Sequence, residues 1–273
     1  MLTTTTDAAA RADAFRALHV PGTPVRIANA WDAGSARLIE SCGAAAIATT
    51  SAGLAWARGY PDGDALPPAV LAVAVAEIVR VVAVPVSVDA EGGYSDDPAV
   101  VAEHVRAIID AGGIGINLED GSGSPDLLVA KIEAARSASD QAGIHLFINA
   151  RTDVYLRGLV PPEQAVEEAL ACGTRYRDAG ADGLFVPGVK DPDAIREIVA
   201  RAGLPLNVLV VPGLAPVADL AALGVARVSA GSGIAQAAAG LARRAATEFL
   251  EDGRYETMFE RDVDYGTLNA LFA

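Results

Sequence analysis

Short apolar runs with β-strand character recur eight times along the 273-residue chain, and segments with helical periodicity separate them. Several of these helical segments end in Gly or Ala-Gly, which suits the left-handed residue that closes many helices. Runs that are apolar along most of their length are typical of parallel strands covered by helices. The pattern predicts an α/β fold in which eight βα units close into a (β/α)8 TIM barrel, with one domain over residues 1–273. The predicted strands are 25–28, 45–49, 86–89, 115–118, 146–150, 183–186, 206–210 and 227–230, and the predicted helices are 33–42, 98–111, 125–142, 162–179, 191–202 and 215–223.

An open, doubly wound sheet is the alternative fold. We disfavour it because no G-x-G-x-x-G sequence follows the first run. Past the eighth run, a helical extension from about 241 to 273 carries apolar side chains that need a partner surface. These side chains are Phe249, Tyr255, Met258, Phe259 and Phe272.

The charge balance limits the partners of the chain. Lys and Arg number 21 against 35 Asp and Glu, a net charge of −14, which disfavours nucleic acid as a partner. No apolar run approaches the roughly 20 residues of a membrane span. The N-terminal residues 1–14 lack the basic start and apolar stretch of a secretory signal, so we expect a cytoplasmic protein. An acidic metabolite would need a local positive charge to bind, and a divalent cation would supply one.

Polar residues gather where several of the predicted strands end, which is where a barrel of this kind carries its chemistry. Asp89 and Glu91 lie two residues apart on an extended segment, so their side chains point the same way, and Glu119 ends the next strand. Three converging carboxylates repel one another unless a cation bridges them, and an all-oxygen set suits Mg²⁺ or Mn²⁺. Alternatively, each carboxylate separately caps a helix or pairs with a surface arginine.

Arg151 is the only basic residue directly at one of these strand ends. It is predicted to clamp a substrate carboxylate or to act as an electrophile, and the alternative is an ion pair with Asp153 or Glu119. Lys131 and Lys190 lie away from the strand ends, which weakens a Schiff-base reading. The sequence shows no Ser-His-Asp arrangement and no P-loop, and both cysteines, Cys42 and Cys172, are predicted to be buried.

Three segments together resemble the isocitrate lyase and phosphoenolpyruvate mutase superfamily: V-S-V-D-A-E-G-G-Y at 86–94, N-L-E-D at 117–120 and N-A-R-T-D at 149–153. The similarity extends from N-A-W-D-A-G-S-A-R-L at 29–38 to R-V-S-A-G-S at 227–232. This resemblance implies a Mg²⁺-dependent barrel, usually a homotetramer, whose eighth helix is exchanged between paired subunits. The apolar extension would fit such an exchange.

The resemblance also implies roles for individual residues. Asp89 matches the carboxylate nearest the metal, and Glu91 and Glu119 match acidic residues that hold its waters. Arg151 matches an arginine that contacts the substrate, and Asp62 resembles an aspartate that faces the metal site and is a candidate catalytic residue. A turn residue beside Gly63 is the alternative for Asp62. The residues that resemble the binding segment for the substrate carboxylate are Thr50, Ser51 and Ala52.

Departures from the family pattern narrow the expected reaction. Isocitrate and methylisocitrate lyases carry K-K-C-G-H on the loop after the fourth strand, whereas residues 121–126 here read G-S-G-S-P-D. Phosphonate-acting members usually have a histidine after the sixth strand, where this chain has Pro187. We therefore expect a Mg²⁺-dependent lyase that cleaves a C–C bond or decarboxylates a small 2-oxo acid, or an adduct of one, through an enolate. The alternatives are a phosphonopyruvate-type mutase or hydrolase and a non-catalytic barrel that binds 2-oxo acids.

Overall fold

A parallel barrel forms the centre of the computed structural model, which describes residues 5–261 and 263–273. β1 (Val25–Ile27) pairs with β9 (Arg227–Ser229), and β2 (Asn29–Ala30) pairs with β3 (Ile47–Thr49). Since only Ala28 separates β1 from β2, they are two halves of one strand, and the pairings therefore close into a ring of eight. This confirms the predicted (β/α)8 barrel. The other strands, in pairing order, are β4 (Val86–Asp89), β5 (Gly115–Glu119), β6 (Phe147–Arg151), β7 (Gly183–Phe185) and β8 (Leu206–Leu209).

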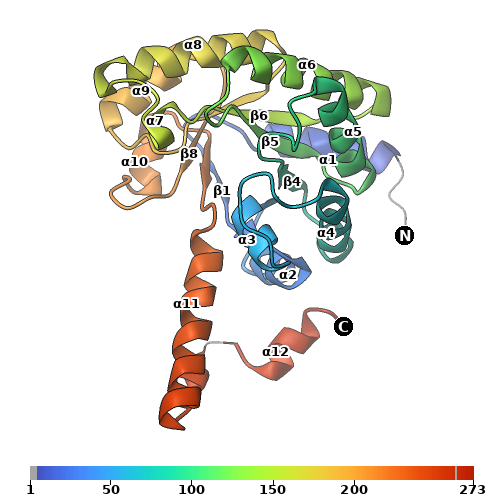
Figure 1. Cartoon of the computed structure of the whole chain (residues 1–273), viewed down its shortest axis with the longest axis vertical. Helices are drawn as coiled ribbons and strands as arrows, with labels where there is room; N and C mark the ends of the chain where they lie inside the picture. The colour runs from blue at the N-terminus through green and yellow to red at the C-terminus, as the bar shows by residue number, and fades with distance from the viewer. Residues whose placement is uncertain (1–4, 262) are drawn as a thin grey trace.

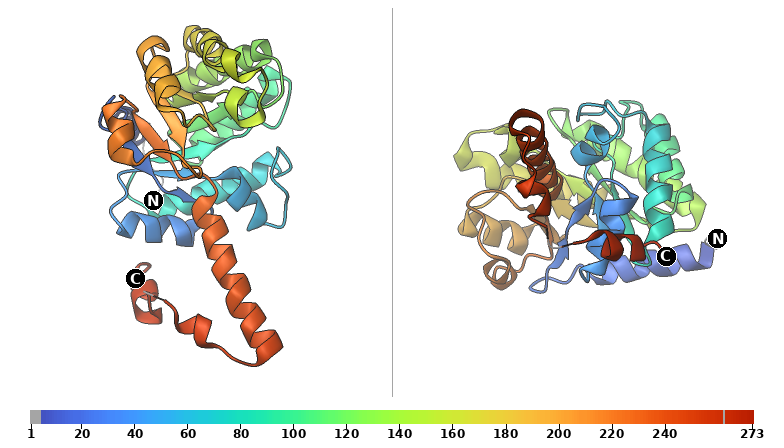
Figure 2. Two further views of the ribbon diagram at one scale, coloured as in Figure 1. Left: turned by 90° about the vertical axis from the view of Figure 1, so that its left-hand side faces the viewer. Right: turned by 90° about the horizontal axis from the view of Figure 1, so that it is seen from below.

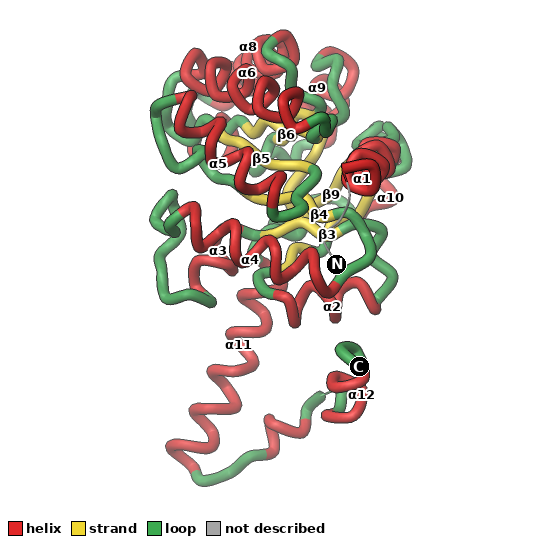
Figure 3. Tube along the Cα trace, turned by 90° about the vertical axis from the view of Figure 1, so that its right-hand side faces the viewer, coloured by secondary structure: helices red, strands yellow, loops and turns green. Residues whose placement is uncertain are grey.

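Helices surround the strands, as Figure 3 shows. Three of them, α5, α6 and α9, begin with proline directly after a capping side chain, Asp97, Ser124 and Asp191, so that each helix starts at a fixed point after its strand. The helices that follow or precede strands are α1 (Thr5–Ala17), α2 (Ala33–Ser41), α3 (Ser51–Trp56), α4 (Pro68–Val81), α5 (Pro98–Asp110), α6 (Pro125–Ala142), α7 (Val154–Arg157), η1 (Pro162–Gln164), α8 (Ala165–Asp178), α9 (Pro192–Arg201) and α10 (Val217–Ala222).

The barrel interior is polar at several levels. The buried side chains on β4 to β6 include Ser87, Asn117 and Asn149, and Asn149 donates to Asn117 Oδ1 at 2.9 Å. Arg227 on β9 is completely buried, and only its Nε has a hydrogen-bond partner among the described residues. Burial lowers the pKa of this guanidinium to about 10. The interior therefore carries a positive charge below the mouth of the barrel.

The C-terminal segment leaves the barrel. α11 (Gly233–Thr247) projects away from the strands, and the chain then turns back through η2 (Glu248–Asp252), η3 (Glu256–Phe259) and α12 (Tyr265–Ala270), as Figures 1 and 2 show. Only Ala235 of α11 is buried. Arg37 of α2 donates from Nε to the Leu271 carbonyl at 2.8 Å, which holds the end of the chain beside the barrel. A groove of about 820 Å³ opens beside the first residues of α11, lined by apolar side chains that include Leu18, Val25, Leu38, Ile39 and Ile234.

Two further predictions are tested by the structure. Cys172 is buried on α8, as predicted, but the prediction for Cys42 is wrong, because Cys42 ends α2 at the surface and is exposed. Among the described residues, no helix is long and apolar enough to cross a membrane. Residues 1–4 of the N-terminal segment that we inspected for a signal lie outside the described residues.

Candidate active site

Asp89 ends β4 at the mouth of the barrel, and its two carboxylate oxygens have different surroundings. Oδ2 accepts a hydrogen bond from the backbone N–H of Ser51 at 3.1 Å, and the backbone N–H of Asp89 donates to Thr49 Oγ1 at 2.8 Å. Oδ1 is buried and has no hydrogen-bond partner within the described chain. A buried anionic oxygen without a donor is costly, so this atom is suited to a cation or a water that a cation holds.

Glu91 joins two loops at the mouth. Its backbone is left-handed, with φ of 49°, and its Oε2 accepts hydrogen bonds from the backbone N–H groups of Gly63 at 2.8 Å and Asp64 at 2.6 Å. Asp64 Oδ1 accepts in return from the N–H groups of Gly92 and Tyr94, both at 3.2 Å. Each loop thus places a carboxylate on the other loop's backbone. The loop after α3 is held against the loop after β4.

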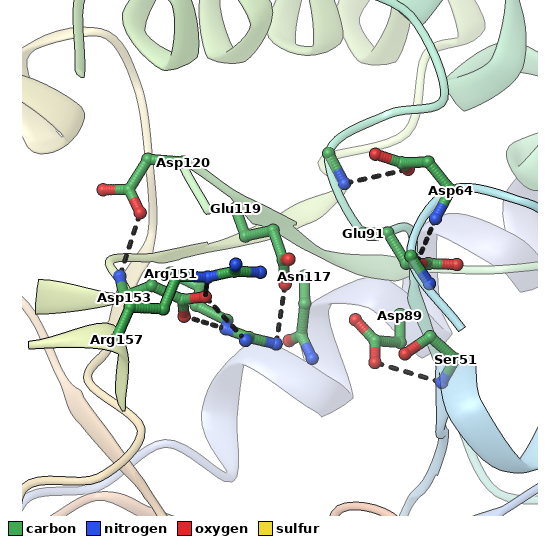
Figure 4. Close-up of polar contacts among 12 residues, drawn as sticks. Ser51, Asp64, Asp89, Glu91, Asn117, Glu119, Asp120, Arg151, Asp153 and Arg157 are labelled. Atoms are coloured by element: carbon green, nitrogen blue, oxygen red, sulfur yellow. Dashed lines mark hydrogen bonds and ion pairs between the residues drawn. The ribbon is translucent and has the colours of Figure 1, made fainter. Parts of the chain in front are cut away.

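Burial raises the pKa of the Glu91 carboxyl, and repulsion from Asp89, Asp62 and Asp64 adds to the effect. Burial likewise raises the pKa of Asp64. Asp62 itself is exposed. Its charge acts on the Glu91 carboxyl, but its side chain makes no buried contact with the described residues. Asp64, Asp89 and Glu91 form one half of the mouth and lie on the right of Figure 4.

Glu119 ends β5, directly across the sheet from Arg151 on β6. Arg151 Nη1 lies 2.6 Å from Glu119 Oε2, and both side chains are about 15% exposed. Burial raises the pKa of Glu119 to about 8, with Arg151 opposing the shift and Asp89 adding to it. The ion pair with Arg151 favours the charged form of Glu119, whereas burial disfavours it. Repulsion from the neighbouring carboxylates adds to the effect of burial, so the pKa of Glu119 is raised. Glu119 lies between the two halves of the site (Figure 4).

A second group, built around Asp153, forms the other half of the mouth. Asp153 is completely buried and accepts from Arg151 Nε at 2.6 Å, from Arg151 Nη2 at 3.0 Å and from Arg157 Nε at 2.8 Å. Its backbone N–H donates to Asp120 Oδ1 at 2.9 Å, and Tyr176 donates from its hydroxyl to Asp120 Oδ2 at 2.6 Å. Both alternative partners of Arg151, Glu119 and Asp153, are therefore present. One aspartate positions two arginines.

The structure brings most of the predicted site residues together. Asp89, Glu91 and Glu119 lie near one another (Figure 4). The negative charge of Asp89 raises the pKa of both glutamates. Ser51 contacts Asp89 at the start of α3, where Thr50 and Ala52 are also buried. Sequence reasoning missed the contributions of Asp64, Tyr94, Asp120, Tyr176 and Arg157.

The residues at the mouth fit a hard divalent cation that is held largely through water. Within residues 5–261 and 263–273, no three His, Cys, Asp or Glu side chains are arranged as a ready-made ligand set. Mg²⁺ does not require one, since it usually keeps several waters and takes one or two carboxylates. The unpartnered Asp89 Oδ1, with Glu91 and Glu119 beside it, is the donor chemistry such an ion prefers.

Comparison with known proteins places the chain among named relatives. The family model described as phosphoenolpyruvate phosphomutase matches residues 15–250. An uncharacterised protein of Mycobacterium tuberculosis (strain H37Rv) is 40% identical over 261 residues, which cover 94% of this chain and 95% of the relative. An oxaloacetate decarboxylase of Pseudomonas fluorescens (strain SBW25) is 30% identical over 234 residues, which cover 80% of this chain and 78% of the relative.

Solved structures agree with these matches. A protein from Burkholderia cenocepacia J2315, provisionally described as a lyase or mutase, is 38% identical and superposes with a TM-score of 0.89, covering 97% of this chain and 96% of that one. A phosphonopyruvate hydrolase solved with oxalate and Mg²⁺ is 25% identical and superposes with a TM-score of 0.81, covering 96% and 94%. The chain belongs to the phosphoenolpyruvate mutase/isocitrate lyase superfamily, whose members are lyases and mutases that act on 2-oxo acid substrates.

Proposed function

We propose that this protein is a Mg²⁺-dependent lyase that cleaves a C–C bond of a small 2-oxo acid, or of its adduct, or decarboxylates it. The observation that carries the proposal is the buried, unpartnered Oδ1 of Asp89 at the end of β4, with Glu91 and Glu119 beside it. Mn²⁺ is an alternative ion, because it prefers the same oxygen ligands.

In this proposal, Asp89 holds the ion directly, and Glu91 and Glu119 hold its waters. When bound, Mg²⁺ would polarise the carbonyl of the 2-oxo acid and stabilise the negative charge of an enolate. The start of α3 faces the same place, so Thr50, Ser51 and Ala52 are proposed to hold the substrate carboxylate. Ser51 already donates its backbone N–H to Asp89, which ties this segment to the metal ligand.

Arg151 supplies a fixed positive charge beside the reacting atoms. Its ion pairs with Glu119 and Asp153 hold the guanidinium in one orientation, so it costs little reorganisation as negative charge develops on the substrate. The raised pKa of Glu119 allows one of its oxygens to hold a proton near neutral pH. Asp62, on the exposed loop next to Glu91, is proposed to complete the mouth when substrate is bound.

The relatives include enzymes of both lyase and phosphoryl chemistry, and they do not decide the substrate. The oxaloacetate decarboxylase relative supports decarboxylation, and the hydrolase solved with oxalate and Mg²⁺ supports a metal site that takes a 2-oxo acid analogue. The same hydrolase makes P–C bond chemistry the second candidate function. The loop at 121–126 contains no Cys, Lys or His, which argues against a lyase with a proton donor on this loop.

The test combines binding and turnover. Metal-free protein is mixed with Mg²⁺ and a panel of 2-oxo acids, hydroxy-acid adducts and phosphonopyruvate, with binding followed by calorimetry and products by NMR. We expect binding that requires Mg²⁺ and cleavage of a 2-oxo acid or adduct. D89N should abolish metal binding. D96N is the control, because Asp96 lies on the loop that follows β4 with a side chain that is 92% exposed and pairs only at 3.5 Å, with Lys131.

Other outcomes assign the protein differently. Release of inorganic phosphate or phosphoenolpyruvate from phosphonopyruvate would establish the second candidate. Tight Mg²⁺-dependent binding without turnover of any compound would identify a non-catalytic barrel that binds 2-oxo acids. If nothing binds with or without Mg²⁺, the carboxylates at the mouth are structural and the proposal is wrong.

We also propose that the chain acts as a homo-oligomer, a dimer or a tetramer, of single-domain barrels. The support is the projecting α11 and the exposed apolar side chains that follow it, which include Phe249, Tyr255 and Phe259. The apolar groove beside the start of α11 is the surface that an exchanged helix would cover. Sedimentation equilibrium of the full chain tests this, and a monomer at micromolar concentration would contradict it.

A further inference from the structure

We propose that Arg157 binds the distal carboxylate of the substrate, so that the 2-oxo acid is a dicarboxylic one. The inference rests on the proposed function and extends it to a substrate class. It concerns the half of the mouth opposite Asp89, where two arginines share one aspartate.

The position of Arg157 suits this role. It is the last residue of the short helix α7, and its Nε donates to Asp153 Oδ2 at 2.8 Å. Asp153 is completely buried, so it fixes the stem of the arginine, whereas the Arg157 side chain is 48% exposed. Its Nη1 has a long contact of 3.4 Å with Ser122 Oγ, and Nη2 would lie 3.9 Å from a Cβ at Gly121. The terminal nitrogens of Arg157 therefore lie next to the loop that follows β5.

Arg151 is less available for the same task. Its Nη1 pairs with Glu119, its Nε and Nη2 donate to Asp153, and its side chain is only 16% exposed. For Arg157, the structure records among the described residues only the bond from Nε and the long contact with Ser122. An arginine held at Nε and open at its two terminal nitrogens presents the forked face that matches a carboxylate.

The negative net charge of the protein means that a second substrate carboxylate needs a local positive group to bind. With a net charge of −14, the protein repels a dianion over most of its surface. A cation at Asp89 would offset the charge of one substrate carboxylate and bind the neutral carbonyl oxygen, and would leave a second carboxylate uncompensated. Arg157 lies on the same side of the barrel mouth as Arg151 and Asp153, across the mouth from Asp89 (Figure 4). A dicarboxylate bound at Asp89 would meet its terminal nitrogens.

The experiment compares matched ligands that differ only in the second carboxylate. Calorimetry in the presence of Mg²⁺ measures 2-oxoglutarate against 2-oxopentanoate, and oxaloacetate against 2-oxobutyrate. A charge-assisted hydrogen bond contributes about 1.5–3 kcal/mol, so the dicarboxylate of at least one pair should bind roughly 10- to 100-fold more tightly. R157Q should remove this margin and leave the monocarboxylate affinity unchanged, and R157K should restore part of it.

R106Q is the matched control. Arg106 also pairs with an aspartate four residues away on a helix, and its side chain is 51% exposed, but it lies outside the mouth. The inference is overturned if the natural protein binds both members of each pair equally, or if R157Q retains the margin. If no 2-oxo acid binds to the natural protein with Mg²⁺, the proposed function itself fails, and the assignment of Arg157 fails with it.

Discussion

Asp153 is expected to be the carboxylate whose charge matters most for the stability of the mouth. It is completely buried, and it accepts three hydrogen bonds from two arginines. D153N keeps the shape and removes the charge. An asparagine oxygen accepts from one guanidinium, but its amide group turns N–H donors toward the other, which leaves the buried Arg151 with Glu119 as its remaining carboxylate partner.

The magnitude follows from burial. Removing one member of a buried ion pair costs about 3–5 kcal/mol. The contact with the half-exposed Arg157 adds at most about 1 kcal/mol. Since a chain of this length loses about 2 °C of Tm per kcal/mol, the total of about 3–6 kcal/mol predicts that D153N melts about 6–12 °C lower than the natural protein. Thermal and urea unfolding, followed by circular dichroism at a fixed protein concentration, measure the change.

D110N is the control for this prediction, because Asp110 pairs with Arg106 at 2.9 Å while its side chain is 59% exposed. It should lower Tm by no more than about 2 °C, since exposed pairs contribute about 0–1 kcal/mol. A D153N protein that melts within 2 °C of the D110N protein would refute the argument that burial makes Asp153 the anchor of both arginines.

Three further predictions follow from the same structure. Because the pKa of Glu119 is raised to about 8, metal-free protein should lose stability as pH rises from about 5 through 8. Mg²⁺ affinity should rise over the same pH range, because the ion binds the deprotonated carboxylate. E119Q should flatten the first trend in thermal melts and the second in calorimetry. R227M should leave urea stability unchanged or raise it by about 1–3 kcal/mol, because it replaces a buried, poorly partnered cation, and a loss above 2 kcal/mol would contradict this. G93A should cost more than about 2 kcal/mol in urea unfolding, because Gly93 has φ of 86° and a Cβ there would lie 2.9 Å from a Val101 methyl; G59A, with φ of 78° in open space, is the control at about 1 kcal/mol.

The strands could be predicted from the sequence because each is a short apolar run between helical segments. All eight runs form strands, and the first continues past its predicted end at Ala28 into β2. The helix α4 was missed because nearly all of its residues are apolar. Only Glu77 and Arg80 are charged among its 14 residues, so the periodicity does not distinguish the face that packs on the barrel from the outer face. α1 was missed because its apolar residues do not form a stripe along one face of the helix. Phe15 nevertheless packs on the barrel and is fully buried.

The strand-end carboxylates of the acidic half of the site could be predicted from the sequence, and the loop contacts around them could not. Asp89 and Glu119 end strands, so their convergence follows from barrel geometry alone. The carboxylates of Glu91 and Asp64 each accept hydrogen bonds from backbone N–H groups of the other's loop, and both residues have left-handed backbone, with φ of 49° and 58°. Non-glycine residues seldom adopt this conformation, and no local sequence pattern announces it. The sequence therefore indicated Asp62 and passed over Asp64.

The basic half depends on where one short helix begins. Arg157 reaches Asp153 because α7 starts at Val154, which places the two side chains four residues apart on one helical turn. That start follows a strand end, a position where sequence alone favours a loop. The same aspartate also accepts from Arg151, so one buried carboxylate orients both arginines. A site that sets carboxylates and a proposed cation against two arginines separates charge across the mouth, and a substrate with a negative group at each end is the ligand that both sides bind at once.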